Sequence, residues 1–397
     1  MKNSANGIQT THVGSLPRPD DLIQMMYAKE EGKPVDKDAL QARIKSSVGE
    51  VVDRQRKAGI DIVNDGEYGK PASSAVDYGA WASYIYERLS GFEPRPLPAG
   101  TNLLAAILGD SKDRQDFQEF YRSAQAERGE QVQPTHFPIC VGPIHYTGHA
   151  FIQRDIANLK AAVTAHGATR AFMTAVVGGV TIFPGPHYGS VEAQSVAVAQ
   201  AMREEYRAIL DAGFDLQLDD PLLVNQYEMH HSINGDLAGF RKWAEAHIEL
   251  VNEGLAGLPE DRIRYHVCWG SWNGPHSSDL PLASVLDLIV KVRAAQYSVE
   301  AANPQHEHEW EDWKRVKLAD GKKLLPGVVT HKTTVLEHPE LVAQRLCRYA
   351  GIVGRENVIA STDCGMGGRI HPTLAWAKLR VLTEGAERAT RRLWPGG

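Results

Sequence analysis

Short apolar runs alternate with amphipathic segments through most of this chain, and this alternation is the feature that most constrains its fold. An apolar run of about four to eight residues is typical of a strand buried on both faces. The amphipathic segments have the period of helices, which parallel strands need as crossover connections. The expected strands are 8–12, 60–64, 138–146, 171–177, 214–218, 263–268, 297–300, 328–330 and 358–361.

Helices are expected over residues 20–26, 37–58, 152–166, 191–212, 236–254, 282–294, 339–350 and 372–392. The nine strand candidates are one more than a closed (β/α)8 TIM barrel needs. We interpret 171–177 as the surplus run, part of a second insertion, with 138–146 as the alternative. An open doubly wound sheet is less favoured, because no glycine-rich phosphate-binding turn follows the first strand.

The alternation breaks down between about residues 72 and 137. We interpret this stretch as one long insertion between strands 2 and 3, and long insertions in compact domains often form lids or binding loops. The sequence therefore predicts an α/β protein. Its single TIM-barrel domain spans residues 1–397 and carries an insertion at about 72–137.

Composition excludes several classes of function. The net charge of −6 is not gathered into a basic stripe, so we predict no binding to nucleic acid. The start lacks an apolar leader and no run of about 18 apolar residues occurs, so we predict a cytoplasmic protein without a membrane partner. Four cysteines do not make a disulfide framework, and a cysteine near a histidine then suggests metal binding or catalysis. A homo-oligomer is compatible with the sequence.

Ligand-type side chains collect where the expected strands end, which is the rim that carries the active site of a TIM barrel. They are Ser15, Asp65, Glu67, Asp219, Asp220, His266, Cys268, Glu300, His331, Asp363 and Cys364. His266 and Cys268 are two residues apart on one strand and so share a face. Taken alone, that pair is explained equally well by packing, since free cysteine is often simply buried. Cys140 and Cys347 are interpreted as packing residues.

Four of these residues, from three strand ends, form a donor set for a metal: His266, Cys268, Glu300 and Cys364. One imidazole, two thiolates and a carboxylate suit the tetrahedral, borderline-soft Zn²⁺ ion. The carboxylate favours a catalytic site, because an oxygen ligand can give way to an incoming substrate. The obvious substrate is a thiol, which zinc would hold as a thiolate. The histidine-rich run 305–310 is interpreted as a solvated loop.

Several motifs resemble the catalytic barrel of cobalamin-independent methionine synthase. They are Thr11-His12-Val13-Gly14-Ser15, Asp65-Gly66-Glu67, Gln217-Leu218-Asp219-Asp220-Pro221, His266-Val267-Cys268 and Asp363-Cys364-Gly365. The resemblance covers nearly the whole chain, but only the catalytic half of the full-length enzyme. It implies the same four zinc ligands that residue chemistry gives.

The same resemblance implies roles for the other rim residues. Ser15, Glu67 and Asp219 are expected to bind the amino-acid substrate, and Asp220 is included in the predicted substrate site. His331 is expected to relay a proton.

The family's folate-contacting tryptophan has no counterpart in the matching stretch 141–149, which weakens the expectation of a folate donor. Other motifs resemble the single-barrel branch close to epoxyalkane:coenzyme M transferase, in which zinc activates the thiol of coenzyme M to open an epoxide. They are Ala75-Val76-Asp77-Tyr78-Gly79-Ala80-Trp81, Cys268-Trp269-Gly270-Ser271-Trp272, Gly274-Pro275-His276 and Ser361-Thr362-Asp363-Cys364.

We therefore expect a zinc-dependent alkyltransferase, with Zn²⁺ as cofactor and a small-molecule thiol and an alkyl donor as partners. It would hold the thiol as a zinc thiolate, either for methyl transfer to a homocysteine-like thiol or for epoxide opening by coenzyme M. His331 is expected to deliver a proton, with Asp219 or Asp220 orienting it. The sequence does not decide the donor or the acceptor.

The two acceptor classes need different partners. Glu67 would hold the ammonium group of homocysteine, whereas a sulfonate would need a cation such as Lys70, Arg18 or Arg369. Two other functions stay open at this point. One is a metal-free lyase like uroporphyrinogen decarboxylase, in which Cys268 and Cys364 are incidental, and the other is a zinc-stabilised binding protein without turnover.

Overall fold

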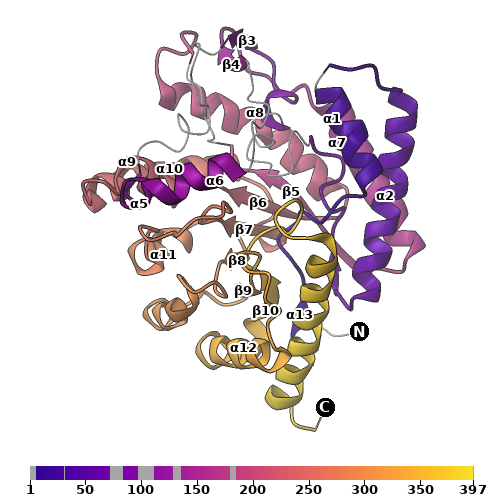
Figure 1. Cartoon of the computed structure of the whole chain (residues 1–397), viewed down its shortest axis with the longest axis vertical. Coiled ribbons are helices and arrows are strands. Elements are labelled where there is room, and N and C mark those ends of the chain that lie inside the picture. Colours follow the sequence, from indigo (N-terminus) through magenta and orange to yellow (C-terminus); the bar gives the residue numbers. More distant parts are fainter. Residues whose placement is uncertain are drawn as a thin grey trace.

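The computed structural model describes residues 6–30, 32–71, 84–96, 111–127, 136–178 and 185–396. Within these residues, eight parallel strands form a nearly closed barrel in the order β1-β10-β9-β8-β7-β6-β5-β2, with helices packed around it (Figure 1). The predicted α/β TIM barrel is confirmed. None of the described helices is both long and apolar enough to cross a membrane.

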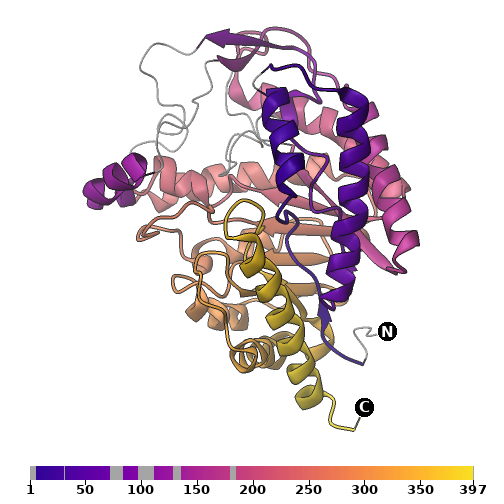
Figure 2. The ribbon, with the colours of Figure 1, turned by 45° about the vertical axis from the view of Figure 1, so that its right-hand side comes forward.

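The barrel strands are β1 (Gln9–Thr10), β2 (Ile62–Val63), β5 (Arg170–Val176), β6 (Asp215–Asp220), β7 (Ile263–Val267), β8 (Gln296–Val299), β9 (Lys323–Val329) and β10 (Ile359–Thr362). The longer helices are α1 (Asp20–Glu30), α2 (Lys37–Lys57), α7 (His149–Ala165), α8 (Val191–Asp211), α10 (Leu237–Gly254), α12 (Pro339–Val353) and α13 (Pro372–Leu393). The closing helix α13 lies between α12 and α2 (Figure 2), where the Arg54 guanidinium stacks 4.2 Å from the Trp376 ring.

The barrel closes between β1 and β2, the two strands at the ends of the order. The N–H of Asp61 donates to the carbonyl of Thr10 at 3.1 Å, and the N–H of Thr10 donates to the Asp61 carboxylate at 2.9 Å. The hydroxyl of Thr11 donates to the carbonyl of Ile62 at 3.1 Å. This closure brings the turns after β1 and β2 side by side at the C-terminal rim.

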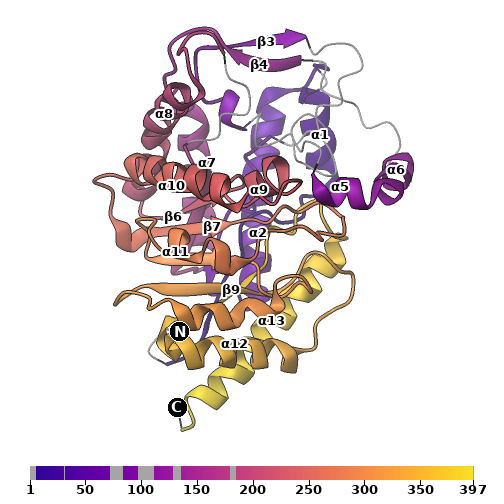
Figure 3. The ribbon, with the colours of Figure 1, turned by 90° about the vertical axis from the view of Figure 1, so that its left-hand side faces the viewer.

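The surplus strand is not the one that we preferred. Residues 171–177 contribute β5, a full barrel strand whose side chains are buried from Ala171 onward, whereas residues 136–140 form β4 (His136–Cys140) outside the barrel. It pairs antiparallel with β3 (Phe92–Pro96), and Pro138 faces Pro94. Proline donates no hydrogen bond to a ladder and is confined to sheet edges, which explains the placement. The β3–β4 pair lies at the opposite end of the molecule from the end of α13 (Figures 1 and 3).

The chain between β2 and α7 holds the predicted insertion at about 72–137. Residues 72–83, 97–110 and 128–135 of it lie outside the described residues, including the expected motif of residues 75–81. Its described parts are β3, α5 (Lys112–Asp116), α6 (Gln118–Glu127) and the start of β4. The short helices α5 and α6 lie beside α9 (Asn225–His230) (Figures 1 and 3).

Two local predictions are wrong. The expected helix 282–294 is only a 3₁₀ turn, η2 (Leu282–Ser284), and a single helical turn, α11 (Leu286–Ile289), because Val285 at φ −140° interrupts the helical backbone. The expected solvated loop 305–310 instead leads into η3 (Glu307–Arg315), a 3₁₀ segment. Its His306 is 1% exposed, with ion pairs to Asp279 and Glu309.

Candidate metal centre and substrate cavity

Two strands bring a soft donor set together at the C-terminal rim. His266 lies on β7, Cys268 follows that strand directly, and Cys364 lies two residues beyond β10. The ligand atoms of these three residues all lie within 4.8 Å of one another. The two Sγ atoms are 3.6 Å apart. The strand register therefore places one imidazole and two sulfurs where a single ion can touch all three.

The orientation of His266 leaves one ring nitrogen for a ligand. Its Nδ1 lies 3.2 Å from the Oγ of Ser298 on β8. Its Nε2 is buried and makes no hydrogen bond within the described part of the chain. A buried polar atom without a partner is unusual and needs an explanation such as a bound ion. A nitrogen held in place through its other ring position is typical of a metal ligand.

Of the two rim cysteines, Cys364 loses its proton the more readily. Contact with Cys268 and His266 holds the pKa of Cys364 well below its ordinary value, although burial opposes this, and the hydroxyl of Ser271 donates to its sulfur at 3.1 Å. The pKa of Cys268 is raised in turn by Cys364 and by burial. One thiolate thus exists beside one thiol. Cysteine binds metals as thiolate, so this donor set fits a soft cation such as Zn²⁺.

Glu300, the predicted fourth ligand, follows β8 and lies outside this three-donor group. Its Oε1 accepts the N–H of Trp269 at 3.0 Å. Its Oε2 accepts from Nδ2 of Asn303 at 2.8 Å and lies 3.2 Å from Nζ of Lys332. The structure therefore places the carboxylate next to the donor set with its oxygens already bonded.

A cavity opens over the three donors, and its space of about 770 Å³ includes part of the open solvent at its mouth. Its lining residues are Val13, Ser15, Arg18, Glu67, Lys70, Pro71, Tyr84, Asp219, Pro221, His266, Cys268, Cys364, Gly365, Gly367 and Arg369. Three of the four predicted substrate residues are among them, as are all three cations expected to suit a sulfonate. Three of the predicted metal ligands and three of the predicted substrate residues thus line one chamber.

Glu67 enters the cavity from the turn after β2. Its backbone is in the left-handed region at φ 63°, and its Oε1 accepts from the hydroxyl of Thr174 at 2.8 Å. Nζ of Lys70 lies 3.8 Å from the same oxygen and donates to the Thr174 hydroxyl. Gly14 gives the carboxylate its space, since a Cβ there would lie 2.4 Å from Glu67 Oε1. The carboxylate is thus fixed beside a cation.

Asp219 also lines the cavity. It is 4% exposed, and its Oδ1 accepts from Nε2 of Gln217 at 2.7 Å. Burial and the charge of Glu67 raise the pKa of Asp219 to about 7, while His266 opposes the rise. Its carboxyl group can therefore exchange a proton near neutral pH.

Asp220 and His331 do not line the cavity. Asp220 points the other way, where its carboxylate bonds His247 and Tyr265, each at 2.6 Å, and two backbone N–H groups. Those contacts favour a structural role for Asp220 rather than the substrate contact that we predicted. His331 is buried, and burial lowers its pKa to about 3. Within the described part of the chain, neither of its ring nitrogens has a hydrogen-bond partner.

Sequence reasoning missed several residues that support the site: Thr174, Ser271, Ser298, Asn303 and Lys332. Thr174 was missed because its strand was assigned to an insertion, although a lone hydroxyl in an apolar strand is a usable signal. Lys332 follows His331 directly, and a lysine at a strand end could have been included among the rim residues. The serines carry no signal of their own, because Ser298 and Ser271 act on residues far away in the sequence. Asn303 bonds Glu300 only three residues earlier, but an asparagine in a loop is too common to be a signal.

Comparison with known proteins places this geometry in a family. Residues 124–388 match the family described as cobalamin-independent synthase, catalytic domain. The chain is 24% identical over 413 residues to the 2-hydroxypropyl-CoM lyase of Xanthobacter autotrophicus, covering 96% of this chain and 94% of that one. It is 22% identical over 402 residues to the methionine synthase of Thermococcus kodakarensis, covering 97% and 94%.

A solved structure has the same fold. It is the B12-independent methionine synthase of Shewanella sp. W3-18-1 in complex with selenomethionine, with a TM-score of 0.70 at 20% identity, covering 98% of this chain and 99% of that one. The resemblance drawn from the sequence motifs is confirmed.

Proposed function

The chain belongs to the family of the cobalamin-independent synthase catalytic domain, and on that premise we propose that it is a zinc-dependent thiol alkyltransferase. The observation that carries the proposal is the gathering of one imidazole nitrogen and two sulfurs within 4.8 Å at the barrel rim. A metal-free lyase would leave both cysteines without a task, and a purely structural zinc site would not need an open chamber beside it. Neither alternative is supported by a specific contact.

His266, Cys268 and Cys364 would hold the ion, and Glu300 is the candidate for a fourth ligand. The ion would supply Lewis-acid chemistry there, lowering the pKa of a substrate thiol so that it could react as a nucleophile. In the reaction, a bond forms between the thiol sulfur and an electrophilic carbon. The bond from that carbon to its leaving group breaks, and the leaving atom keeps the electron pair. The proton lost by the thiol balances the negative charge on the leaving atom.

The chain's own residues bind the substrate and carry this proton. We assign the proton to Asp219, whose pKa of about 7 suits the exchange. His331 lies outside the cavity lining and its pKa is lowered to about 3, so it is a neutral imidazole that resists protonation and is not assigned the proton. Ser15 and Glu67 contact the part of the thiol substrate farthest from sulfur.

The cavity suggests the class of acceptor. Arg18, Lys70 and Arg369 line it together with the carboxylates of Glu67 and Asp219. These three cations outnumber the two carboxylates in the lining, and the excess of positive charge favours a thiol that carries an anionic group. Homocysteine and coenzyme M are both such thiols, and they differ in that only homocysteine also carries an ammonium group.

The test is thiol binding observed at the metal. Cobalt(II) replaces zinc in the purified protein, and each thiol is titrated while sulfur-to-cobalt charge-transfer absorption is recorded. We expect a new band with homocysteine or with coenzyme M, and none in a Cys364→Ser variant. A wild-type protein that binds cobalt but gives no new band with either thiol contradicts the proposal.

A further inference from the structure

Glu300 is paired with a cation that the predicted metal site does not include. Nζ of Lys332 lies 3.2 Å from Glu300 Oε2, and the two side chains are 13% and 0% exposed. Burial alone lowers the pKa of Lys332, but Glu300 and Asp279 outweigh it and raise the pKa above its ordinary value. Lys332 is therefore an ammonium group at neutral pH, and solvent ions screen this pair weakly.

A metal ion and Lys332 attract the same oxygen. Glu300 Oε1 is held by the N–H of Trp269, so Oε2 is the oxygen that Lys332 shares with Asn303. Both Lys332 and the metal are cations, and each weakens the hold of the other on one carboxylate. The strength of Glu300 as a metal ligand therefore depends on how firmly Lys332 is held in place.

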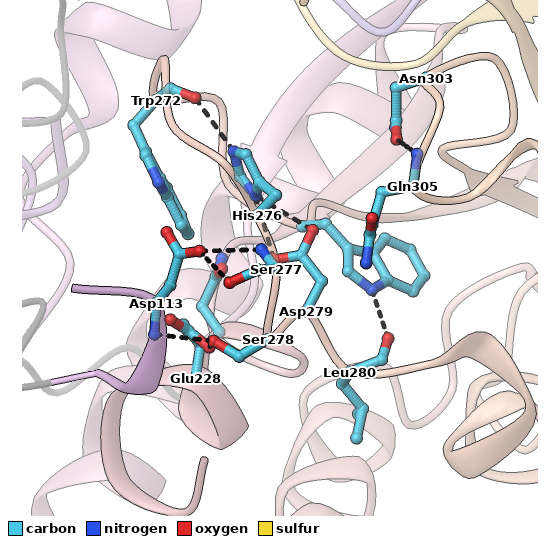
Figure 4. Close-up of polar contacts among 12 residues, drawn as sticks. Asp113, Glu228, Trp272, His276, Ser277, Ser278, Asp279, Leu280, Asn303 and Gln305 are labelled. Atoms are coloured by element: carbon cyan, nitrogen blue, oxygen red, sulfur yellow. Dashed lines mark hydrogen bonds and ion pairs between the residues drawn. The ribbon is translucent and has the colours of Figure 1, made fainter. Parts of the chain in front are cut away.

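Lys332 packs against a histidine on the loop after β7. Its Nζ lies 3.4 Å from Nε2 of His276. The His276 ring sits between the carbonyl of Trp272 and the carboxylate of Asp279, each at 3.0 Å (Figure 4). His276 is 3% exposed and adopts φ 53°, a conformation that a side chain of this size holds only when its surroundings impose it.

The loop is in turn anchored by the insertion. Asp113 of α5 points toward Ser277 and accepts its N–H at 2.8 Å, while the N–H of Asp113 donates to the hydroxyl of Ser278 at 3.0 Å (Figure 4). The Ser278 hydroxyl donates to Glu228 at 2.7 Å. Because both sides of the loop are fixed, Lys332 cannot follow Glu300 toward a metal without leaving His276.

We propose that Lys332 is a positioning residue that competes with the metal for the Glu300 carboxylate and keeps one metal position exchangeable for the thiol. The inference rests on the proposed function, because it requires the metal. Without the ammonium, a buried and uncompensated carboxylate turns to the nearest cation, which is the metal. A merely structural role gives the opposite sign, since a damaged site binds metal more weakly.

The experiment is a double-mutant cycle on the full-length protein with Lys332→Met, Glu300→Gln and the double variant. Zinc affinity is measured by competition with a chromophoric chelator, and thiol affinity by titrating homocysteine and coenzyme M into the cobalt protein. We expect Lys332→Met to tighten zinc binding by about tenfold and to weaken thiol binding by a similar factor. Lys323→Met is the matched control, because Lys323 lies at the far end of β9 and its ammonium donates to the carbonyl of Glu356 at 2.8 Å.

The Glu300→Gln background separates competition from plain charge repulsion. Removing a nearby ammonium tightens cation binding in any background, so the proposal requires the effect of Lys332→Met to shrink clearly when Glu300 is neutral. An equal effect in both backgrounds, or weaker zinc binding in Lys332→Met, overturns the inference. Absence of zinc binding by the wild-type protein overturns the proposed function instead.

A second variant covers the case in which Lys332→Met does not fold. His276→Asn keeps the charge of Lys332 and suits a positive φ, but removes the ring that packs against the ammonium. It is expected to shift both affinities in the same directions by a smaller factor. Unchanged zinc and thiol affinities in a folded His276→Asn protein count against the inference.

Discussion

Two buried histidines lie on opposite sides of the barrel, one after β1 and one on β7, and their hydrogen bonds differ. His12 uses both ring nitrogens, since Nε2 lies 2.8 Å from Oε1 of Gln55 and Nδ1 accepts the N–H of Gly14 at 3.2 Å. His266 bonds through Nδ1, and its Nε2 has no hydrogen-bond partner among the described residues.

The two environments move the pKa values in opposite directions. Burial lowers the pKa of His12 to about 4, whereas Cys364, Asp219 and Glu300 raise that of His266 despite burial. Burial alone therefore does not distinguish a candidate metal ligand from a packing histidine. What distinguishes the β7 side is an orphaned nitrogen that faces two sulfurs and a surplus of negative charge.

Removing a sulfur is expected to have the largest effect on the β7 side. Cys268→Ser and Cys364→Ser should each weaken zinc binding by more than the roughly 10–100-fold loss typical of changes around metal ligands. Cys347→Ser on α12 serves as the matched control. Equilibrium dialysis with zinc measures all three variants. Equal zinc affinity in the Cys268, Cys364 and Cys347 variants would mean that the two rim sulfurs are packing residues.

Buried His12, after β1, is expected to make the stability of the fold depend on pH. The folded-state pKa of His12, about 4, is below its ordinary value of 6.5, so the fold favours the neutral ring. That stabilisation is complete above pH 6.5 and is lost as the pH falls toward 4, by about 3 kcal/mol. Urea unfolding at a series of pH values measures the slope.

A His12→Asn variant should lose the His12 share of this slope and keep the share of His331, whose pKa is lowered by burial to about 3. The exposed His187→Gln should retain the whole slope. A slope in His12→Asn equal to that of the wild type would mean that His12 is not held neutral by the fold.

Removing the hydrogen-bond partner of His266, rather than a sulfur, should change zinc affinity less. Ser298→Ala takes away the partner of His266 Nδ1 and should weaken zinc binding by about 10- to 100-fold. Ser361→Ala on β10 makes the same change at another buried position, and should leave zinc affinity as it is. The same chelator competition compares the two variants. A Ser298→Ala protein with wild-type affinity would show that the imidazole is oriented by other contacts.

The smallest effect is expected in the substrate half of the chamber. Glu67→Gln should weaken homocysteine binding by about tenfold, because it removes the partner of the ammonium group, and should spare coenzyme M. Lys70→Met should instead weaken coenzyme M binding and spare homocysteine binding. Neither should alter zinc affinity, which distinguishes them from the β7 variants. Thiol titration of the cobalt protein reads both, with the exposed Glu249→Gln as control; identical responses to the two thiols would contradict these roles.

The sequence predicted the parts of this molecule that depend on local pattern. The barrel followed from the alternation of strands and helices, and the gathering of His266, Cys268 and Cys364 followed from their places at strand ends. We chose the wrong surplus strand, because both candidates are apolar runs. Pro138 distinguishes them, since a proline inside a strand indicates the edge of a sheet.

The rest depended on contacts between distant segments. Nothing local to Glu300 reveals that Lys332, 32 positions later, bonds its carboxylate. The burial of His306 was equally hidden, since its partner Asp279 comes from another loop. A histidine-rich polar run therefore resembled a solvated loop, although its charge is compensated inside the fold.

The central claim is that the β7 and β10 strand ends form a metal site. It is tested most directly by the zinc content of wild-type protein purified without chelator, measured by mass spectrometry alongside the protein concentration. We expect one zinc ion per chain in the wild type and a much lower zinc content in the Cys268→Ser, Cys364→Ser double variant. A folded wild-type protein that contains no zinc and takes none up on dialysis would contradict it.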